Sequence, residues 1–270
     1  YYNFIPEYER SESMPENAFR PSRIILFTSC KGGVGKSTVC ANLAMSLALR
    51  GKSVLMIDCD FGSRCLDLVA GFSDDVVYDI ADAVLGRVSP ERVIVADRRT
   101  DKLFFIAAPY NFDTRMNIFS FRRTVSAYAA CGKYDYIFID TPGGIGEPLA
   151  FASSVADTAY IVTSPTRASV RAADKTAAFL YDRGVKHLRL IINQVTGKRA
   201  SAEKLRLIDI IDGAAVKLIG AVPYDYELVR AGDEGKLTDE LYSRNITRAF
   251  DNIAGRTEGE NIPLFYKIRK

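Results

Sequence analysis

The sequence has a single histidine, His187, among its 270 residues. Serine and cysteine nucleophiles usually depend on a histidine as their general base, so the sequence argues against catalysis by a Ser-His or Cys-His pair. No apolar run approaches the roughly 20 residues that a membrane-spanning helix needs. Residues 1–20 are acidic and polar and lack the apolar stretch of a signal peptide. We therefore expect neither a transmembrane helix nor a secretory leader.

Cysteine is scarce and badly placed for pairing. The number of cysteines is odd, and no two of them form a C-x-x-C pair: Cys30, Cys40, Cys59, Cys65 and Cys131. We therefore expect reduced thiols and a cytoplasmic protein rather than a disulfide framework. Cys40, Cys59 and Cys131 are expected to be small residues of the core.

The charge balance gives little sign of a nucleic-acid partner. The net charge is only +3, and residues 241–270 alone contribute six basic and three acidic side chains, which accounts for the whole excess. Hydrophobic residues make up 48% and charged residues 26%, which is typical of a globular protein. The length fits one large domain with extensions.

Short apolar segments alternate with amphipathic ones along the chain. We expect strands at 23–28, 53–57, 103–107, 136–139, 159–163, 188–192 and 217–221. Helices are expected at 38–49, 76–85, 121–131, 170–182, 202–211 and 241–254. This alternation predicts an α/β fold with a mostly parallel, doubly wound sheet flanked by helices. We assign residues 1–22 to an extension, 23–255 to a single P-loop NTPase domain, and 256–270 to a basic tail.

A glycine-rich segment joins the first expected strand to the first expected helix. It follows the phosphate-loop pattern G-x-x-x-x-G-K-[ST], except that Cys30 replaces the first glycine. Glycines let successive N–H groups turn toward phosphate oxygens, and the helix adds its positive dipole end. The predicted nucleotide-binding residues are Lys31, Gly32, Gly33, Val34, Gly35, Lys36, Ser37 and Thr38. Lys36 should reach the β- and γ-phosphates, and the Ser37 hydroxyl should bind Mg²⁺.

A second lysine, Lys31, precedes the glycines. With it, the segment resembles the deviant Walker A motif of the MinD/ParA family of P-loop ATPases. In that family this lysine reaches across a dimer to the partner's nucleotide. The resemblance therefore implies that ATP or ADP binds with Mg²⁺, that Lys31 and Lys36 are catalytic, and that the ATP state is a homodimer.

Two carboxylates, Asp58 and Asp60, follow the strand expected at 53–57, and we expect this strand to neighbour the phosphate loop. Two residues apart in an extended segment, they share a side and can hold Mg²⁺ through water. Residues 56–71 are similar to the pattern D-x-D-x-G-x-R-x-L-D of MinD-type members, and Val-Val-Tyr-Asp at 76–79 follows the same members. The resemblance implies that Asp60 activates the attacking water and that Asp58 supports Mg²⁺. The alternative is a polar strand end that makes turn hydrogen bonds.

Three further positions follow expected strands. Asp140 begins the sequence Asp-Thr-Pro-Gly-Gly; it can bind Mg²⁺ through water, and the glycines let the next segment move. An ordinary strand-to-loop turn is the alternative there. The resemblance implies that Asn193 hydrogen-bonds adenine, with a structural turn role as the alternative. Residues 220–225, with Pro223 among them, are similar to the family segment that wraps the base.

The end of the chain supports two hypotheses. Residues 241–254 carry Tyr242, Ile246, Phe250 and Ile253 at helical spacing, which predicts a helix docked on the domain. Residues 262–270 combine apolar and basic side chains, but about two turns make a marginal free helix. One hypothesis is that the tail makes a weak peripheral contact with the inner face of the cell membrane, and that a dimer strengthens this contact by presenting two tails. The other is that the tail is disordered or docks on the core of the domain.

The resemblance favours an ATPase switch that hydrolyses ATP to ADP and phosphate and regulates the placement of the division septum. MinC- and MinE-like regulators are implied by it. The alternatives are a positioning ATPase for flagellum or pilus assembly, and a ParA-like DNA-partition ATPase. A DNA-partition ATPase needs a basic stripe on its surface. Because the net charge is only +3, DNA is not an expected partner. A metallocluster carrier is disfavoured because it would need paired thiolates, which the sequence lacks. A scaffold that binds nucleotide without hydrolysing it is disfavoured because it would not need the motif carboxylates.

Overall fold

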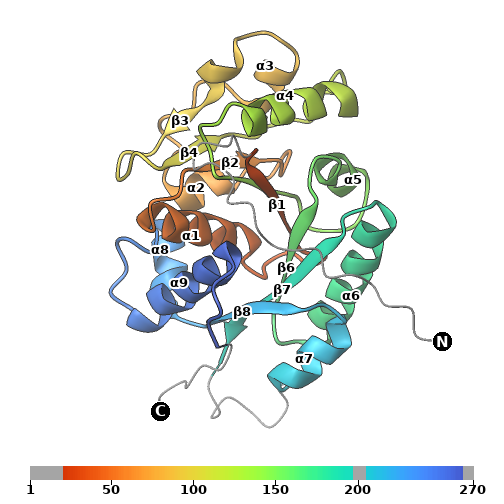
Figure 1. Cartoon of the computed structure of the whole chain (residues 1–270), viewed down its shortest axis with the longest axis vertical. Coiled ribbons are helices and arrows are strands. Elements are labelled where there is room, and N and C mark those ends of the chain that lie inside the picture. Colours follow the sequence, from red (N-terminus) through yellow and green to blue (C-terminus); the bar gives the residue numbers. More distant parts are fainter. Residues whose placement is uncertain (1–20, 197–204, 264–270) are drawn as a thin grey trace, which may run out of the picture.

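The computed structural model describes residues 21–196 and 205–263. Eight strands form one sheet, in the spatial order β3-β4-β2-β5-β1-β6-β7-β8 (Figure 1). The strands are β1 Arg23–Thr28, β2 Val54–Asp58, β3 Val95–Ala96, β4 Leu103–Ile106, β5 Tyr136–Asp140, β6 Thr158–Thr163, β7 His187–Val195 and β8 Leu218–Pro223. Neighbours are parallel except β3, which is antiparallel to β4. The predicted mostly parallel sheet is confirmed.

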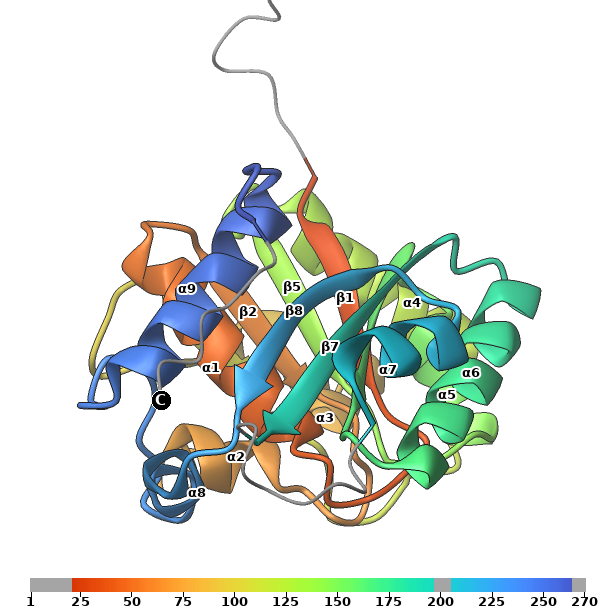
Figure 2. The same cartoon turned by 90° about the horizontal axis from the view of Figure 1, so that it is seen from below.

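Helices cover both faces of the sheet, as Figures 1 and 2 show from two directions. One hydrophobic core lies beneath α1 Lys36–Leu49, α2 Leu66–Ala70, α8 Tyr226–Asp233 and α9 Arg244–Glu258. The core on the other face lies beneath α3 Ile80–Val84, α4 Ile118–Ala130, α5 Glu147–Ser153, α6 Arg167–Asp182 and α7 Leu207–Ala214, with the 3-10 turn η1 Pro90–Val93. None of the helices in the described part of the chain has the length and apolar character to cross a bilayer.

The central strands are apolar on both sides because both sides are covered. Every residue of β2 and β5 is buried. Along β1, Leu26 packs into one core while Ile25 and Phe27 pack into the other. The Phe27 ring lies 4.8 Å from that of Phe138, measured between ring centroids. These strands therefore hold their carboxyl ends at fixed positions along one edge of the sheet.

Some expected boundaries are wrong. The helix expected at 76–85 is reduced to α3, because the Asp79 side chain accepts hydrogen bonds from the N–H groups of Ala81 and Asp82 and so caps a helix that begins at Ile80. Three short helices, α2, α5 and α8, are present where none is expected. The helix expected at 202–211 begins instead at Leu207, and residues 197–204 lie outside the described residues.

Two expectations about single side chains are also wrong. Tyr242 precedes α9 and is 92% exposed, and its backbone N–H donates to the Glu227 carboxylate. Ile246, Phe250 and Ile253 are buried as expected, and the helix runs past residue 255 to Glu258. Cys131 is exposed at the end of α4, whereas Cys40 and Cys59 are buried. Residues 1–20, which make up most of the expected extension, and residues 264–270, the last part of the expected tail, lie outside the described residues.

Helix α9 presses against the edge strand β8 at Gly220. A Cβ atom built on Gly220 would lie 2.2 Å from Cγ1 of Ile253, whose side chain is fully buried. Only glycine therefore fits between strand and helix at this position.

We predict that Gly220→Ala lowers the free energy of unfolding by about 1–3 kcal/mol, because the added methyl overpacks a core side chain that has nowhere to move. Gly232→Ala is the matched control: it lies in α8, where a Cβ meets nothing within 4 Å. That variant should be unchanged or gain up to about 1 kcal/mol from reduced chain entropy. Urea unfolding measures both. Equal stability of the two variants would contradict the close contact.

Candidate functional site

The predicted phosphate loop lies between β1 and α1, at the carboxyl ends of the central strands. Gly33 and Gly35 have φ angles of 78° and 81°, which are costly for other residues. Cβ atoms built on Gly32 and Gly33 would meet nothing within 4 Å, so the loop presents open backbone on its outer side. Val34 is buried and holds the loop on the core. This shape suits a bound phosphate group.

Lys36, Ser37 and Asp140 form a compact polar cluster beneath the loop. The Lys36 Nζ lies 2.6 Å from Asp140 Oδ1 and donates to Ser37 Oγ at 3.1 Å. The Ser37 hydroxyl donates to Asp140 Oδ2 at 2.6 Å. Lys36 is 7% exposed and Asp140 is fully buried. Burial alone would lower the pKa of Lys36, but the attraction of Asp140 outweighs it and the pKa is raised, so the lysine stays charged.

Asp58 lies directly beside Asp140 in the sheet register. Strand β5 lies between β2 and the phosphate-loop strand β1. The carboxyl ends of all three strands still meet at one edge. Asp58 also makes the turn hydrogen bonds of the alternative interpretation: its Oδ1 accepts from the N–H of Asp60 at 2.8 Å, and its Oδ2 from that of Leu66 at 3.3 Å.

The carboxylates at this edge repel one another. Burial, followed by the charge of Asp140, raises the pKa of Asp58 to about 8. Burial, with a contribution from Asp140, also raises the pKa of the half-buried Asp60. A divalent cation would relieve this repulsion, and hydroxyl and carboxylate oxygens are the ligands that Mg²⁺ prefers.

Within residues 21–196 and 205–263, no three His, Cys, Asp or Glu side chains form a closed metal cage. Mg²⁺ does not require one, since it usually takes one or two protein oxygens and completes its shell with water and phosphate. Ser37 and Asp140, whose oxygens are adjacent, fit such a site.

The segment after Asp140 lies against the phosphate loop. Thr141 donates to the Phe27 carbonyl through its N–H and its hydroxyl, and the Gly144 N–H donates to the Ser29 carbonyl at 2.8 Å. A Cβ on Gly143 would stand 3.7 Å from the backbone nitrogen of Gly32. A change in the conformation of the phosphate loop would therefore act directly on residues 141–144.

A cavity of about 280 Å³ opens beside the phosphate loop. Five predicted binding residues line it: Gly33, Gly35, Thr38, Asn193 and Pro223. Tyr224 and Asp225, which belong to the segment 220–225 singled out in the sequence, line it as well. The sequence did not indicate the other lining residues, which are Val69 of α2, Gln194 of β7, and Leu228, Val229, Gly232 and Asp233 of α8. The cavity adjoins the loop and combines apolar side chains with a few polar ones, which suits a flat ring such as a nucleotide base.

The end of β7 braces the phosphate loop. The buried Asn193 donates through Nδ2 to the Val34 carbonyl at 2.8 Å, and Gln194 donates through Nε2 to the Gly33 carbonyl at 3.1 Å. Gln194 has a φ of 59°, which is uncommon outside glycine. Gln194 was not predicted, and only its place next to Asn193 hints at it. A Cβ on Gly35 would lie 2.3 Å from Asn193 Nδ2, so this glycine is required sterically as well.

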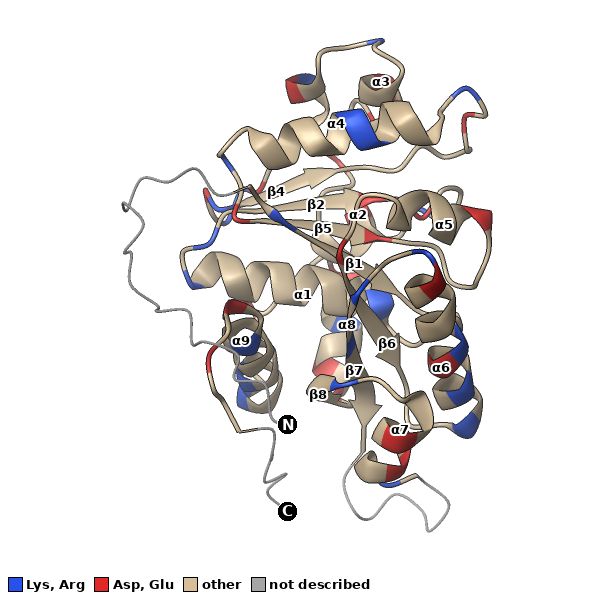
Figure 3. Ribbon diagram, turned by 45° about the vertical axis from the view of Figure 1, so that its right-hand side comes forward, with Lys and Arg blue, Asp and Glu red and all other residues tan. Residues whose placement is uncertain are grey.

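Lys31 is exposed at the rim of the site. Among the described residues, no predicted site residue forms a hydrogen bond or an ion pair with the Lys31 side chain. Figure 3 shows basic and acidic positions interspersed along the ribbon of the described residues. Helix α6 carries Arg167, Arg171 and Lys175 with Asp174 among them, all exposed. The described surface of α6 is therefore interrupted by an acidic residue rather than being uniformly basic.

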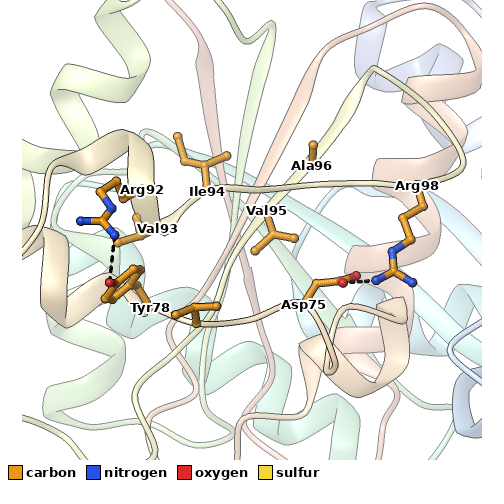
Figure 4. A pocket seen from close by; sticks show the side chains of 9 residues that line it. Asp75, Tyr78, Arg92, Val93, Ile94, Val95, Ala96 and Arg98 are labelled. Atoms are coloured by element: carbon orange, nitrogen blue, oxygen red, sulfur yellow. Dashed lines mark hydrogen bonds and ion pairs between the residues drawn. The ribbon is translucent and has the colours of Figure 1, made fainter.

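A larger hollow of about 600 Å³ lies elsewhere, against the edge strand β3 (Figure 4). One end carries Arg92, which donates to the Tyr78 hydroxyl at 3.0 Å, and the other end carries an ion pair between Arg98 and Asp75. None of the predicted site residues lines it. Its size alone does not make it the candidate site, because it holds none of the polar clusters described above.

Comparisons with known proteins agree with this geometry. The family model of the CobQ/CobB/MinD/ParA nucleotide binding domain matches residues 25–238. The septum site-determining protein MinD of Synechocystis is 35% identical over 248 residues, which cover 90% of this chain and 92% of that protein. The corresponding protein of Bacillus subtilis is 33% identical, over 89% of this chain and 90% of its own.

Solved structures give the same result. MinD in the MinC:MinD cell division complex of Aquifex aeolicus has a TM-score of 0.84 and 34% identity, covering 91% of this chain and 99% of that one. MinD of Pyrococcus horikoshii, solved with Mg-ADP, has a TM-score of 0.77 and 26% identity, covering 88% and 96%. Taken with the deviant phosphate loop, these matches establish that the chain is a member of the CobQ/CobB/MinD/ParA family of nucleotide-binding domains.

Proposed function

We propose that this chain is a Mg²⁺-dependent ATPase switch that pairs with a second copy in its ATP state and helps to place the division septum. The observation that carries the proposal is the cluster of Lys36, Ser37 and Asp140 directly beneath an open phosphate loop. Its family consists of P-loop ATPases, and its named relatives are septum site-determining proteins.

Each part of the nucleotide has a matching surface. The phosphates would lie against the open backbone at Gly32 and Gly33, and the base would enter the cavity beside Pro223. Asn193 is held by Val34 through its amide nitrogen, so its carbonyl oxygen is the atom that would accept from the amino group of adenine. The dipole of α1 adds positive potential at the phosphates.

Lys36 pairs with Asp140, and a bound triphosphate would offer it a partner of higher negative charge. Ser37 and Asp140 would then hold Mg²⁺, with Asp58 behind them. Bound there, the ion would neutralise charge on the phosphates. The chain's own residues thus supply positioning and charge stabilisation, which is most of what phosphoryl transfer requires.

Asp60 and Lys31 have the remaining roles. Asp60 is half-buried at the edge of the site and would orient the attacking water. Lys31 is exposed at the rim, which suits a side chain that reaches the phosphates of a partner subunit.

The relatives indicate the cellular role. Because the Aquifex structure is a complex of MinC with MinD, we infer that this chain binds a MinC-like partner and responds to a MinE-like regulator. Contact with the inner face of the membrane would use the tail, whose residues 264–270 lie outside the described residues. DNA partition is disfavoured because Asp174 interrupts the basic residues of α6. Flagellum or pilus positioning remains the alternative.

We predict that Asp60→Ala slows phosphate release from ATP about a hundred-fold while ATP binding persists, because the attacking water loses its acceptor. The control Asp101→Ala removes an exposed aspartate of the β3–β4 turn and should behave as wild type. Steady-state phosphate release and nucleotide titration measure the two quantities. Equal turnover in wild type and Asp60→Ala would remove the catalytic role from Asp60.

Lys31→Ala is expected to abolish ATP-dependent pairing while leaving nucleotide binding by the monomer intact, because the missing lysine acts on the partner's phosphates. Light scattering of samples with ATP, with ADP and without nucleotide gives the mass of each species. Lys186→Ala, which removes an exposed lysine on a distant turn, should pair like wild type. A Lys31→Ala protein that still pairs in ATP would contradict the assigned role.

Deletion of the gene from the source cell should produce misplaced septa, and the intact gene should restore their position, while the Lys31→Ala gene should not. Fluorescence microscopy of the division sites measures this. Misplaced flagella or pili with normal septa would favour the alternative function.

A further inference from the structure

Arg99, in the turn between β3 and β4, links the ends of two helices that wall the base cavity. Its Nη2 donates to the carbonyl of Ala70, the last residue of α2, at 2.8 Å. Its Nη1 donates to the carbonyl of Gly235, just after α8, at 3.2 Å. Both acceptors are main-chain atoms, so the side chain holds the two backbones rather than two mobile side chains.

The guanidinium group is itself held in place. Asp97, whose side chain is 2% exposed, accepts from Arg99 Nη2 at 2.7 Å and from Nε at 3.1 Å. The Arg99 N–H donates to the same carboxylate at 2.7 Å. Bidentate pairing with a buried carboxylate fixes the plane of the guanidinium. The remaining donors are then directed at the two carbonyls and, at a longer 3.5 Å, at Glu240 Oε1.

The backbones that Arg99 joins are in direct contact. Gly71 and Gly235 both have positive φ angles, 77° and 67°. A Cβ on Gly71 would lie 2.5 Å from the Gly235 carbonyl oxygen, and one on Gly235 would lie 2.8 Å from the Gly71 Cα. Because no side chain separates the ends of α2 and α8, the distance between these helices is set by this contact and by the two hydrogen bonds of Arg99.

That distance matters for the cavity. Val69, one residue before Ala70, lines the cavity, and so do Leu228, Val229 and Gly232 of α8. The phosphate loop, in contrast, is braced from β7 through Asn193 and Gln194, with no hydrogen bond from Arg99.

We propose that Arg99 is a positioning residue that sets the width of the base cavity, and thereby the affinity contributed by the base but not by the phosphates. The inference rests on the proposed nucleotide function and deepens it. Arg99 would thus contribute to specificity for the base although it does not line the cavity and contacts only the backbone at the ends of the two helices that do.

The neighbouring Arg98 supplies a matched control. It has the same charge and lies in the same turn, but its side chain is 77% exposed and pairs with Asp75 at the hollow beside β3 (Figure 4). Removing it changes the charge of the turn equally without releasing α2 or α8.

The experiment compares ATP with tripolyphosphate, each with Mg²⁺, in competition against a fluorescent ATP analogue. Arg99→Ala should weaken ATP binding about ten-fold, as expected for the loss of about 1.4 kcal/mol. It should change tripolyphosphate binding by less than about two-fold. Arg98→Ala should bind both ligands like wild type. In steady-state hydrolysis Arg99→Ala should raise KM and leave kcat near wild type.

Arg99→Lys covers the case in which Arg99→Ala fails to fold, as judged by its thermal transition. A single ammonium group cannot hold Asp97 and both carbonyls together, so this variant should show the same selective loss for ATP. Equal weakening of ATP and tripolyphosphate, or unchanged ATP binding, in the folded Arg99 variant overturns the inference. A wild-type chain that binds no adenine nucleotide would instead overturn the proposed function, so the two failures are distinguishable.

Discussion

The site depends on one buried ion pair, between Lys36 at the start of α1 and Asp140 at the end of β5. Removing either charge would leave the other without a partner in a region closed to water, which is more costly than losing the pair as a whole. The pair is therefore stable only while both groups have a partner. A triphosphate with its cation offers a partner to each of them simultaneously, a negative one to Lys36 and a positive one to Asp140. Under the proposed function, nucleotide binding would therefore change the partners of Lys36 and Asp140 without leaving either charge unpaired.

The parallel sheet brings the charged groups of the site close together. Because β2, β5 and β1 lie side by side, their carboxyl ends bring Asp58, Asp140 and the phosphate loop to one edge. The cost of gathering acidic groups appears in the pKa of Asp58, which burial and Asp140 raise to about 8. The apolar cores on both faces stabilise the strands that hold these groups together. The fold therefore maintains a repulsive arrangement that a cation would relieve.

Sequence reasoning succeeds where the signal is local. The phosphate loop is a contiguous motif, and β1 agrees with the expected 23–28 because an apolar run ends in glycines there. It fails where contacts are long-range. The insertion of β5 between β2 and β1 depends on strand order, which no local pattern encodes. Helix α2 is only five residues long, too short for a periodic signal, yet it forms a wall of the cavity. Arg99 binds backbone carbonyls, which leave no trace in residue types, and Gln194 does the same.

The two ends of α1 differ in what holds them, and this difference indicates where a nucleotide signal would travel. At its far end, Arg50 pairs with Asp251, Glu258 and Glu260, and so ties α1 to α9 and the residues that follow it. At its near end, α1 begins at the phosphate loop, beside the glycine segment after Asp140 and the segment after Asp58. The glycines of the first segment and the exposed residues 62–63 of the second carry few packing constraints. With the far end of α1 anchored by three ion pairs, these two segments have more freedom to change conformation than the helix itself. Under the proposed function, they are where a change in the bound nucleotide would be transmitted.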